Sequence, residues 1–140
     1  MIECKDVVRM RVPFPSISSN LAVQAHMYVC IENGSTKEFV KCQTFKPVHK
    51  IKHKYPLRFV EEEANIQRNP FSKKTTIDCD KAFVLDGVVV GLDLLTTSRR
   101  DVCEDLFNII KSETNHSQFR KEQVEPNEVL NLNTRMQASG

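Results

Sequence analysis

The amino-acid sequence predicts a mainly β fold, a small and strongly bent antiparallel barrel with one amphipathic helix packed across it. Three observations lead to this prediction. Short runs of β-branched and aromatic residues recur along most of the chain. The dipeptides Asn33-Gly34 and Asp86-Gly87 are typical of tight type I′ hairpins, in which both central residues need φ > 0. A single helical stripe of apolar residues follows between residues 102 and 110.

The central strand is expected at Val23 to Ile31. The residues after His26 are apolar without a break, which is typical of a strand buried on both faces. His26 stands where a polar loop becomes this strand. Its imidazole is either held by a backbone carbonyl at the strand end or reaches solvent as a functional group.

The remaining strands are short. Pro13 and Pro15 end the first, because proline donates no hydrogen bond to a sheet. A turn of helix is expected at Glu61 to Gln67, and Asn69-Pro70 breaks it. Besides the central strand, we expect strands at Asp6 to Val12, Glu38 to Thr44, Leu57 to Val60, Thr75 to Cys79, Ala82 to Leu85 and Val88 to Val90.

The helix is predicted at Ser98 to Lys111. Ser98 resembles an N-cap, with acidic residues in the turns that follow. Its apolar stripe consists of Val102, Leu106, Phe107, Ile109 and Ile110. We therefore divide the chain into a barrel domain with its closing helix at 1–112 and a polar, mostly mobile tail at 113–140, in which residues 124–132 could hold a short helix.

Composition narrows the class of protein. The net charge is only +2, so the distribution of charge must carry any argument about partners. The five cysteines include no Cys-x-x-Cys pair and fit reduced thiols of an intracellular protein. Neither a signal segment nor an apolar run long enough to span a membrane is recognisable. We therefore expect a cytoplasmic protein without membrane contact.

Residues 41–58 are basic. They contain no acidic residue, and His49 and His53 lie between Phe45 and Tyr55. This stretch is expected to be an exposed loop or ribbon, either an ordinary solvated loop or a binding surface for nucleic acid. Its cationic residues are Lys41, Lys46, Lys50, Lys52, Lys54 and Arg58.

The sequence lacks the motifs of several common kinds of site. The four glycines form no phosphate-binding loop, and no Ser-His-Asp or Cys-His signature is recognisable. The acidic run Glu61-Glu62-Glu63 is expected to be a solvated face. Asp78 and Asp80 flank Cys79 without further ligands for a metal. The sequence therefore predicts neither a cofactor nor a metal.

The constellation that remains is His26, Gln43 and Thr44. If the strands on either side of Asn33-Gly34 pair, these residues lie at about the same level of the sheet. A histidine titrates near neutral pH and can move a proton to or from a ribose hydroxyl. The hydroxyl of Thr44 and the amide of Gln43 could hold phosphate oxygens as charge develops on them.

Five stretches, in order, carry a resemblance to a known family. They are Asp-Val-Val-Arg-Met-Arg-Val-Pro-Phe-Pro, His-Met-Tyr-Val-Cys-Ile, the strand end Cys-Gln-Thr, Ile-Asp-Cys-Asp-Lys-Ala-Phe-Val-Leu-Asp, and the amphipathic helix. In order and spacing, Met1 to Ile110 resembles the MazF/PemK family of toxin-antitoxin ribonucleases.

The resemblance implies an SH3-like barrel that forms a homodimer and is neutralised by a cognate antitoxin. It implies cleavage of single-stranded RNA without a metal, leaving a 2′,3′-cyclic phosphate. It makes His26, Thr44 and Gln43 the catalytic residues. The expected RNA-binding residues are Arg9, Arg11, Ser18, Ser19, Lys46, Lys50, Lys52, Lys54 and Arg58.

The chain departs from the family pattern at several positions. His26 replaces the family's catalytic arginine, and Met27 replaces the proline after it. Lys81 follows Asp80 where the family has Asp-Gln. Thr44 matches the family's strand-end threonine, although Gln43 takes that place if the register shifts by one. His26 could transfer the proton while Arg11 or Lys46 supplies positive charge. The alternative is a non-catalytic barrel that binds nucleic acid or protein.

Overall fold

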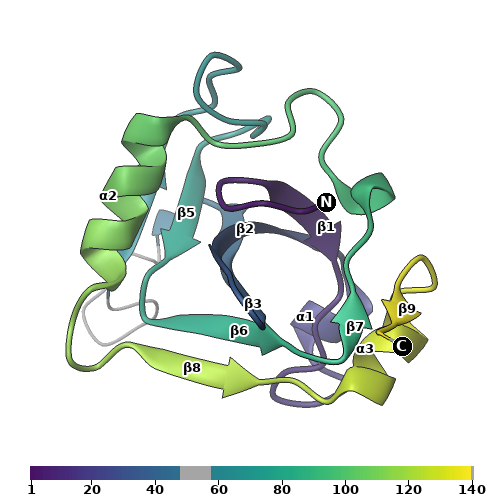
Figure 1. Ribbon diagram of the computed structural model, residues 1–140. Coiled ribbons are helices and arrows are strands. Elements are labelled where there is room, and N and C mark those ends of the chain that lie inside the picture. Colours follow the sequence, from purple (N-terminus) through teal and green to yellow (C-terminus); the bar gives the residue numbers. More distant parts are fainter. Residues whose placement is uncertain (48–57, 140) are drawn as a thin grey trace.

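A computed structural model describes residues 1–47 and 58–139, and it is mainly β, with one strongly bent sheet (Figure 1). The strands are β1 (Val7–Met10), β2 (His26–Asn33), β3 (Lys37–Thr44), β4 (Phe59–Glu62), β5 (Thr75–Asp78), β6 (Lys81–Leu85), β7 (Val88–Val89), β8 (Arg120–Gln123) and β9 (Gln137–Ala138). The helices are α1 (Asn20–Val23), the 3₁₀ helix η2 (Leu92–Leu94), α2 (Glu104–Thr114) and α3 (Pro126–Leu132).

The main sheet has the strand order β1-β2-β3-β5-β4, and all these neighbours are antiparallel. β3 has two partners on its other side, because Cys42–Thr44 pairs with β5 and Lys37–Phe39 pairs with β6. β8 then pairs with β6 in parallel. The pairings among the described residues do not close a ring, so a mainly β fold is confirmed and a closed barrel is not.

Both faces of the sheet are buried. On one face lie Val8, Tyr28 and Phe39, and on the other lie their chain neighbours Val29 and Val40, each with no exposed surface. Side chains alternate between the faces of a strand, so an unbroken apolar run is needed where both faces are covered. The prediction that the central strand is buried on both faces is confirmed.

The helix α2 covers one of these faces, and its buried side chains include Leu106 and Ile110. It begins later than expected, at Glu104. The Sγ of Cys103, not Ser98, caps it by accepting a hydrogen bond from the Leu106 N–H at 3.4 Å. The predicted start at Ser98 is wrong because the Ser98 hydroxyl instead donates to the carbonyl of Pro70.

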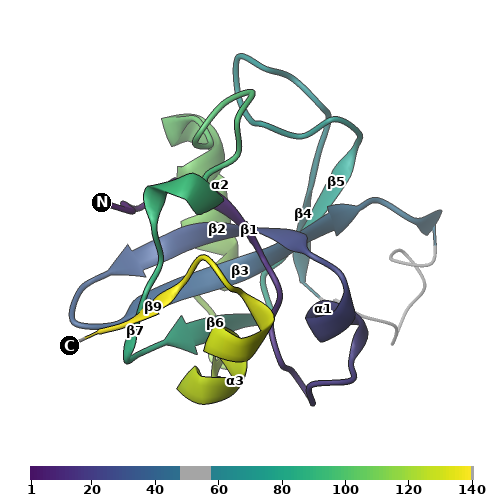
Figure 2. The same ribbon diagram turned by 90° about the vertical axis from the view of Figure 1, so that its right-hand side faces the viewer.

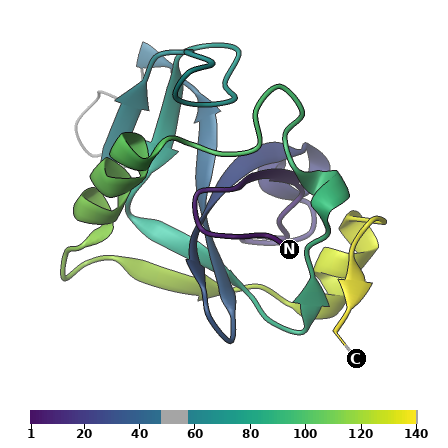
Figure 3. The ribbon, with the colours of Figure 1, turned by 45° about the horizontal axis from the view of Figure 1, so that its top comes forward.

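The C-terminal residues cover the other face, where we expected a mobile tail. Val124, Val129 and Met136 are buried in the same cluster as Tyr28 and Phe83. α3 lies within the predicted helical stretch, and β9 pairs with β7. Figure 3 shows α2 and the α3–β9 segment on opposite sides of the molecule.

The two predicted hairpins differ from expectation. β2 and β3 do form one, with α1 at the end where β2 begins (Figure 2). Three residues join the paired Asn33 and Lys37, and neither Asn33 nor Gly34 has positive φ, so the type I′ turn is wrong. Gly87 has φ +78°, but β6 and β7 pair with other strands rather than with each other.

The acidic segment after β4 is also different. Glu61 and Glu62 belong to β4 rather than to a turn of helix. Glu62 is buried, and its carboxylate accepts hydrogen bonds at 2.8 Å from both Arg68 and Asn69. The expected solvated face is therefore wrong at this position, because a buried carboxylate needs such partners.

Candidate functional site

His26 is the first residue of β2 and pairs with Met10 of β1. At the start of β2, the pair between β2 and β3 nearest to His26 joins Met27 to Cys42. Continuing this register by one residue brings His26 opposite Gln43. Thr44, the next residue, ends β3 and pairs with Thr75 of β5. Gln43, rather than Thr44, is therefore the cross-strand neighbour of the imidazole.

A backbone carbonyl fixes the tautomer of the neutral imidazole. The His26 Nδ1 lies 3.1 Å from the carbonyl oxygen of Gln24. A carbonyl only accepts, so Nδ1 carries the hydrogen and the neutral ring keeps its lone pair on Nε2. Partial burial lowers the pKa of His26 below 6.5, and the charges of Lys41, Arg9 and Lys46 act in the same direction. The ring is thus neutral and basic at neutral pH.

A cavity of about 190 Å³ brings the three predicted catalytic residues together. We call it the histidine cavity; His26, Gln43, Thr44, Arg9, Ser72 and Lys73 are among the residues that line it. His26 and Gln43 are half-buried, and Thr44 is exposed. The cavity therefore combines a base, hydroxyls, an amide and cations at one end of the β2–β3 hairpin.

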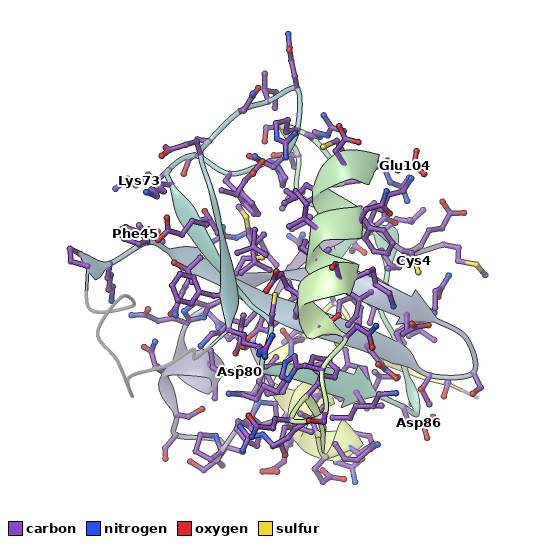
Figure 4. All side chains as sticks on the ribbon, turned by 90° about the vertical axis from the view of Figure 1, so that its left-hand side faces the viewer. Cys4, Phe45, Lys73, Asp80, Asp86 and Glu104 are labelled. Atoms are coloured by element: carbon purple, nitrogen blue, oxygen red, sulfur yellow. The ribbon has the colours of Figure 1, made fainter. Side chains whose placement is uncertain are left out.

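Sequence reasoning missed Ser72 and Lys73. They precede β5, and the Lys74 carbonyl accepts the Phe45 N–H at 2.8 Å, which fixes this segment beside the end of β3. Figure 4 shows the side chains of Lys73 and Phe45 on the same side of the molecule. The dibasic pair Lys73-Lys74 was the available signal, but its place beside the end of β3 depends on the β3–β5 pairing.

The expected RNA-binding residues are spread more widely. Arg9 lines the histidine cavity, and Lys46 is exposed close enough to influence the His26 pKa. Arg11 lies instead in a neighbouring cavity of about 470 Å³, which Arg9 and Arg135 also line. The backbone N–H of Arg11 donates to Asn133 Oδ1, and Asn133 Nδ2 donates to the carbonyl of Arg11, both at 2.7 Å.

The other expected RNA-binding residues lie away from His26. Ser18 is exposed, and its Oγ lies 3.1 Å from that of Ser16. Arg58 is exposed beside Asp80, which accepts its backbone N–H. Ser19 lines a different cavity, which Gln43 also lines. Lys50, Lys52 and Lys54 lie outside the described residues.

Acidic and sulfur ligands do not converge on a metal site within residues 1–47 and 58–139. Asp78 is buried and forms an ion pair with Lys81 at 3.7 Å. The five cysteines are all free thiols. In the same part of the chain, no helix has the length and apolar character needed to cross a membrane.

Comparison with models of known protein families, with curated proteins and with solved structures finds no match to this chain. Its function must therefore be argued from its own residues.

Proposed function

We propose that this protein is a toxin-like endoribonuclease that cleaves single-stranded RNA without a metal ion, with the histidine cavity as its active site. The observation that carries the proposal is the gathering of His26, Gln43 and Thr44 around one cavity that Arg9 and Lys73 also line. A neutral imidazole beside hydroxyl, amide and cationic groups suits a phosphodiester whose own 2′-hydroxyl is the nucleophile.

In the proposed reaction, His26 Nε2 takes the proton of the ribose 2′-hydroxyl. The 2′ oxygen attacks phosphorus, the bond to the 5′ oxygen breaks, and water protonates the leaving oxygen. Arg9 and Lys73 stabilise the charge that develops on the phosphate oxygens, and Thr44 and Gln43 orient them. The products end in a 2′,3′-cyclic phosphate and a 5′-hydroxyl. DNA is no substrate because it lacks the attacking hydroxyl.

The wider biological role rests on the resemblance of Met1 to Ile110 to MazF/PemK toxins. On that basis we propose an SH3-like barrel that works as a homodimer and is inhibited by a cognate antitoxin. The strongly bent sheet with α2 packed on it supports the fold part of this proposal.

The test is incubation of labelled single-stranded RNA of mixed sequence with the wild-type protein, with and without EDTA. We expect cleavage at equal rates in both, cyclic phosphate ends by mass spectrometry, and no cleavage of DNA of the same sequence. Loss of cleavage in EDTA would refute the metal-independent mechanism. If RNA binds but is never cut, the protein is instead a non-catalytic RNA-binding module.

A further inference from the structure

A second cavity, of about 320 Å³, lies beside the histidine cavity, and Gln43 lines both. We call it the lysine cavity; it is lined by Lys41, Lys81, Arg120, Asp78, Ser19 and Phe14, among others. It lies where β3 changes from pairing with β5 to pairing with β6. Lys41 lies between the residues paired with β5 and those paired with β6, where the sheet divides.

The charges in this cavity do not balance. Lys41, Lys81 and Arg120 are cationic, whereas Asp78 is the acidic residue among those that line it. Lys81 takes the Asp78 carboxylate as its ion-pair partner, with both side chains nearly buried. Burial raises the pKa of Asp78, which weakens its hold on charge further. Among the lining residues one carboxylate faces three cations, and Arg120 has a second carboxylate outside the cavity, that of Glu122 at 3.9 Å.

Lys41 is the cation left over. It is half-buried, and burial lowers its pKa. Continuing the β3–β5 register places it opposite Asp78, yet no hydrogen bond or ion pair of its ammonium group occurs within the described residues. The attraction of the Asp78 carboxylate only partly offsets the solvation that this ammonium group loses on burial, because its pKa is still lowered. A ligand with negative charge would supply the missing partner.

Two hydroxyls nearby are also unsatisfied. The Ser19 Oγ is buried without a hydrogen-bond partner in the described part of the chain. The same holds for the Oη of Tyr28, the cross-strand neighbour of Lys41. Buried polar groups are nearly always hydrogen-bonded, and of these two residues Ser19 lines the lysine cavity, where a bound ligand could supply its missing partner.

The lysine cavity also has apolar lining residues, one of which, Phe14, has the Lys81 ammonium 5.9 Å from its ring centroid. Phe14, Pro15 and Leu21 line the cavity, and the Phe14 ring packs edge-on against Phe83 with centroids 5.3 Å apart. Single-stranded nucleic acids are held by cations along the phosphates and by aromatic rings beneath the bases. The lysine cavity offers both.

We propose that the lysine cavity binds the nucleotide next to the scissile phosphate, with its internal phosphodiester at Lys41 and Arg120 and its base against Phe14. This inference rests on the proposed function for its position, because Gln43 joins the two cavities. The strand thus passes from His26 across Gln43 into the lysine cavity.

The test measures binding separately from cleavage. The probe is a labelled, mixed-sequence RNA hexamer of 2′-O-methyl nucleotides, which cannot attack its own phosphates. Lys41→Met should weaken its binding about tenfold or more, the usual order for one charged hydrogen bond, and Arg120→Gln should also weaken it. Lys37→Met is the matched control on the same strand, and its affinity should equal that of wild type. Thermal unfolding of each variant verifies the fold.

The source of the phosphate is tested in parallel. An internal phosphodiester predicts equal affinity for hexamers with a 5′-phosphate and a 5′-hydroxyl, and no competition by millimolar inorganic phosphate. A preference for the 5′-phosphate that Lys41→Met removes, or competition by inorganic phosphate, would overturn the internal site. So would equal affinity of Lys41→Met and wild type, or of Lys41→Met and Lys37→Met. If Lys41→Met does not fold, the exposed Arg120→Gln decides: wild-type affinity in that variant would overturn the proposal.

The two proposals fail separately. Binding that depends on Lys41 in a protein that cuts no RNA would refute the ribonuclease but keep the lysine cavity. If the protein cuts RNA but Lys41→Met and Arg120→Gln bind the hexamer as wild type does, the nucleotide site in the lysine cavity is refuted and the ribonuclease proposal stands.

Discussion

The histidine and lysine cavities share Gln43, but their surroundings differ. In the first, partial burial and the charges of Lys41, Arg9 and Lys46 lower the pKa of His26 and outweigh the Gln24 carbonyl, which raises it. In the second, Lys41 keeps a positive charge for which the described residues provide no ion pair. A group that takes up a proton must be able to change its charge, whereas a group that holds a phosphate needs a charge left unpaired. The comparison therefore assigns chemistry to one cavity and binding to the other.

The largest expected effect is that of His26→Ala on the rate. A proton-transfer group typically contributes about 10²- to 10⁴-fold, so kcat should fall by about that factor. The affinity for the non-cleavable hexamer should stay within about twofold of wild type, since no charge is lost from a neutral ring. Single-turnover cleavage and fluorescence anisotropy measure the two quantities. A wild-type kcat in this variant would show that the histidine cavity is not the site of the reaction.

A change outside both cavities should affect stability alone. Leu106 is a fully buried residue of α2, so Leu106→Ala should lower the free energy of unfolding by about 2–5 kcal/mol. The control is Ile109→Ala on the same helix, where the side chain is exposed and the change should stay under about 0.5 kcal/mol. Urea unfolding measures both. Equal effects would mean that α2 does not pack on the sheet as described.

Thr44→Val should have a smaller effect on the rate than His26→Ala. It removes one oriented hydroxyl and keeps the shape, which corresponds to about 0.5–1.5 kcal/mol, or about two- to tenfold in kcat. Gln43→Ala gives the contrast, because Gln43 lines both cavities. It should raise the Kd for the hexamer as well as lower kcat. If Thr44→Val is as slow as His26→Ala, Thr44 takes part in proton transfer.

The smallest expected effect is a shift in pH dependence. A base must be neutral to act, so the rate should fall as the pH drops through the His26 pKa, with the midpoint below 6.5. Arg9 lowers this pKa, so Arg9→Gln should move the midpoint upward by less than about one unit. The pH–rate profile of cleavage measures it. A downward shift would show that the titrating group is not His26.

Much of the sheet could be predicted from local sequence. The unbroken apolar run of β2 signalled a strand with two covered faces, and Val29 and Tyr28 occupy opposite cores. The return strand β3 was placed within one residue of its start. His26, Gln43 and Thr44 could be grouped because a hairpin fixes its own register.

The parts that were missed depend on distant residues. The sequence of β8 is Arg-Lys-Glu-Gln, which shows no apolar alternation. Backbone pairing with β6, not a pattern of side chains, places it in the sheet. Ser98 fits the N-cap preference better than Cys103 does, but Ser98 contacts Pro70 and Asp101 forms a bridge with Asp6, so the helix starts only at Glu104. The lysine cavity depends on the division of β3 between two partners, which no local pattern announces.

The clamp between Asn133 and Arg11 has a consequence for the newly made chain. The two residues are 122 positions apart, and ribosomes add about 5–20 residues per second, so Arg11 waits about 6–24 s for its partner. Until then, the backbone that carries Arg9 and Arg11 lacks its last support. A polypeptide still under synthesis, surrounded by ribosomal RNA and messenger, therefore does not yet present the complete cavity that Arg9, Arg11 and Arg135 line.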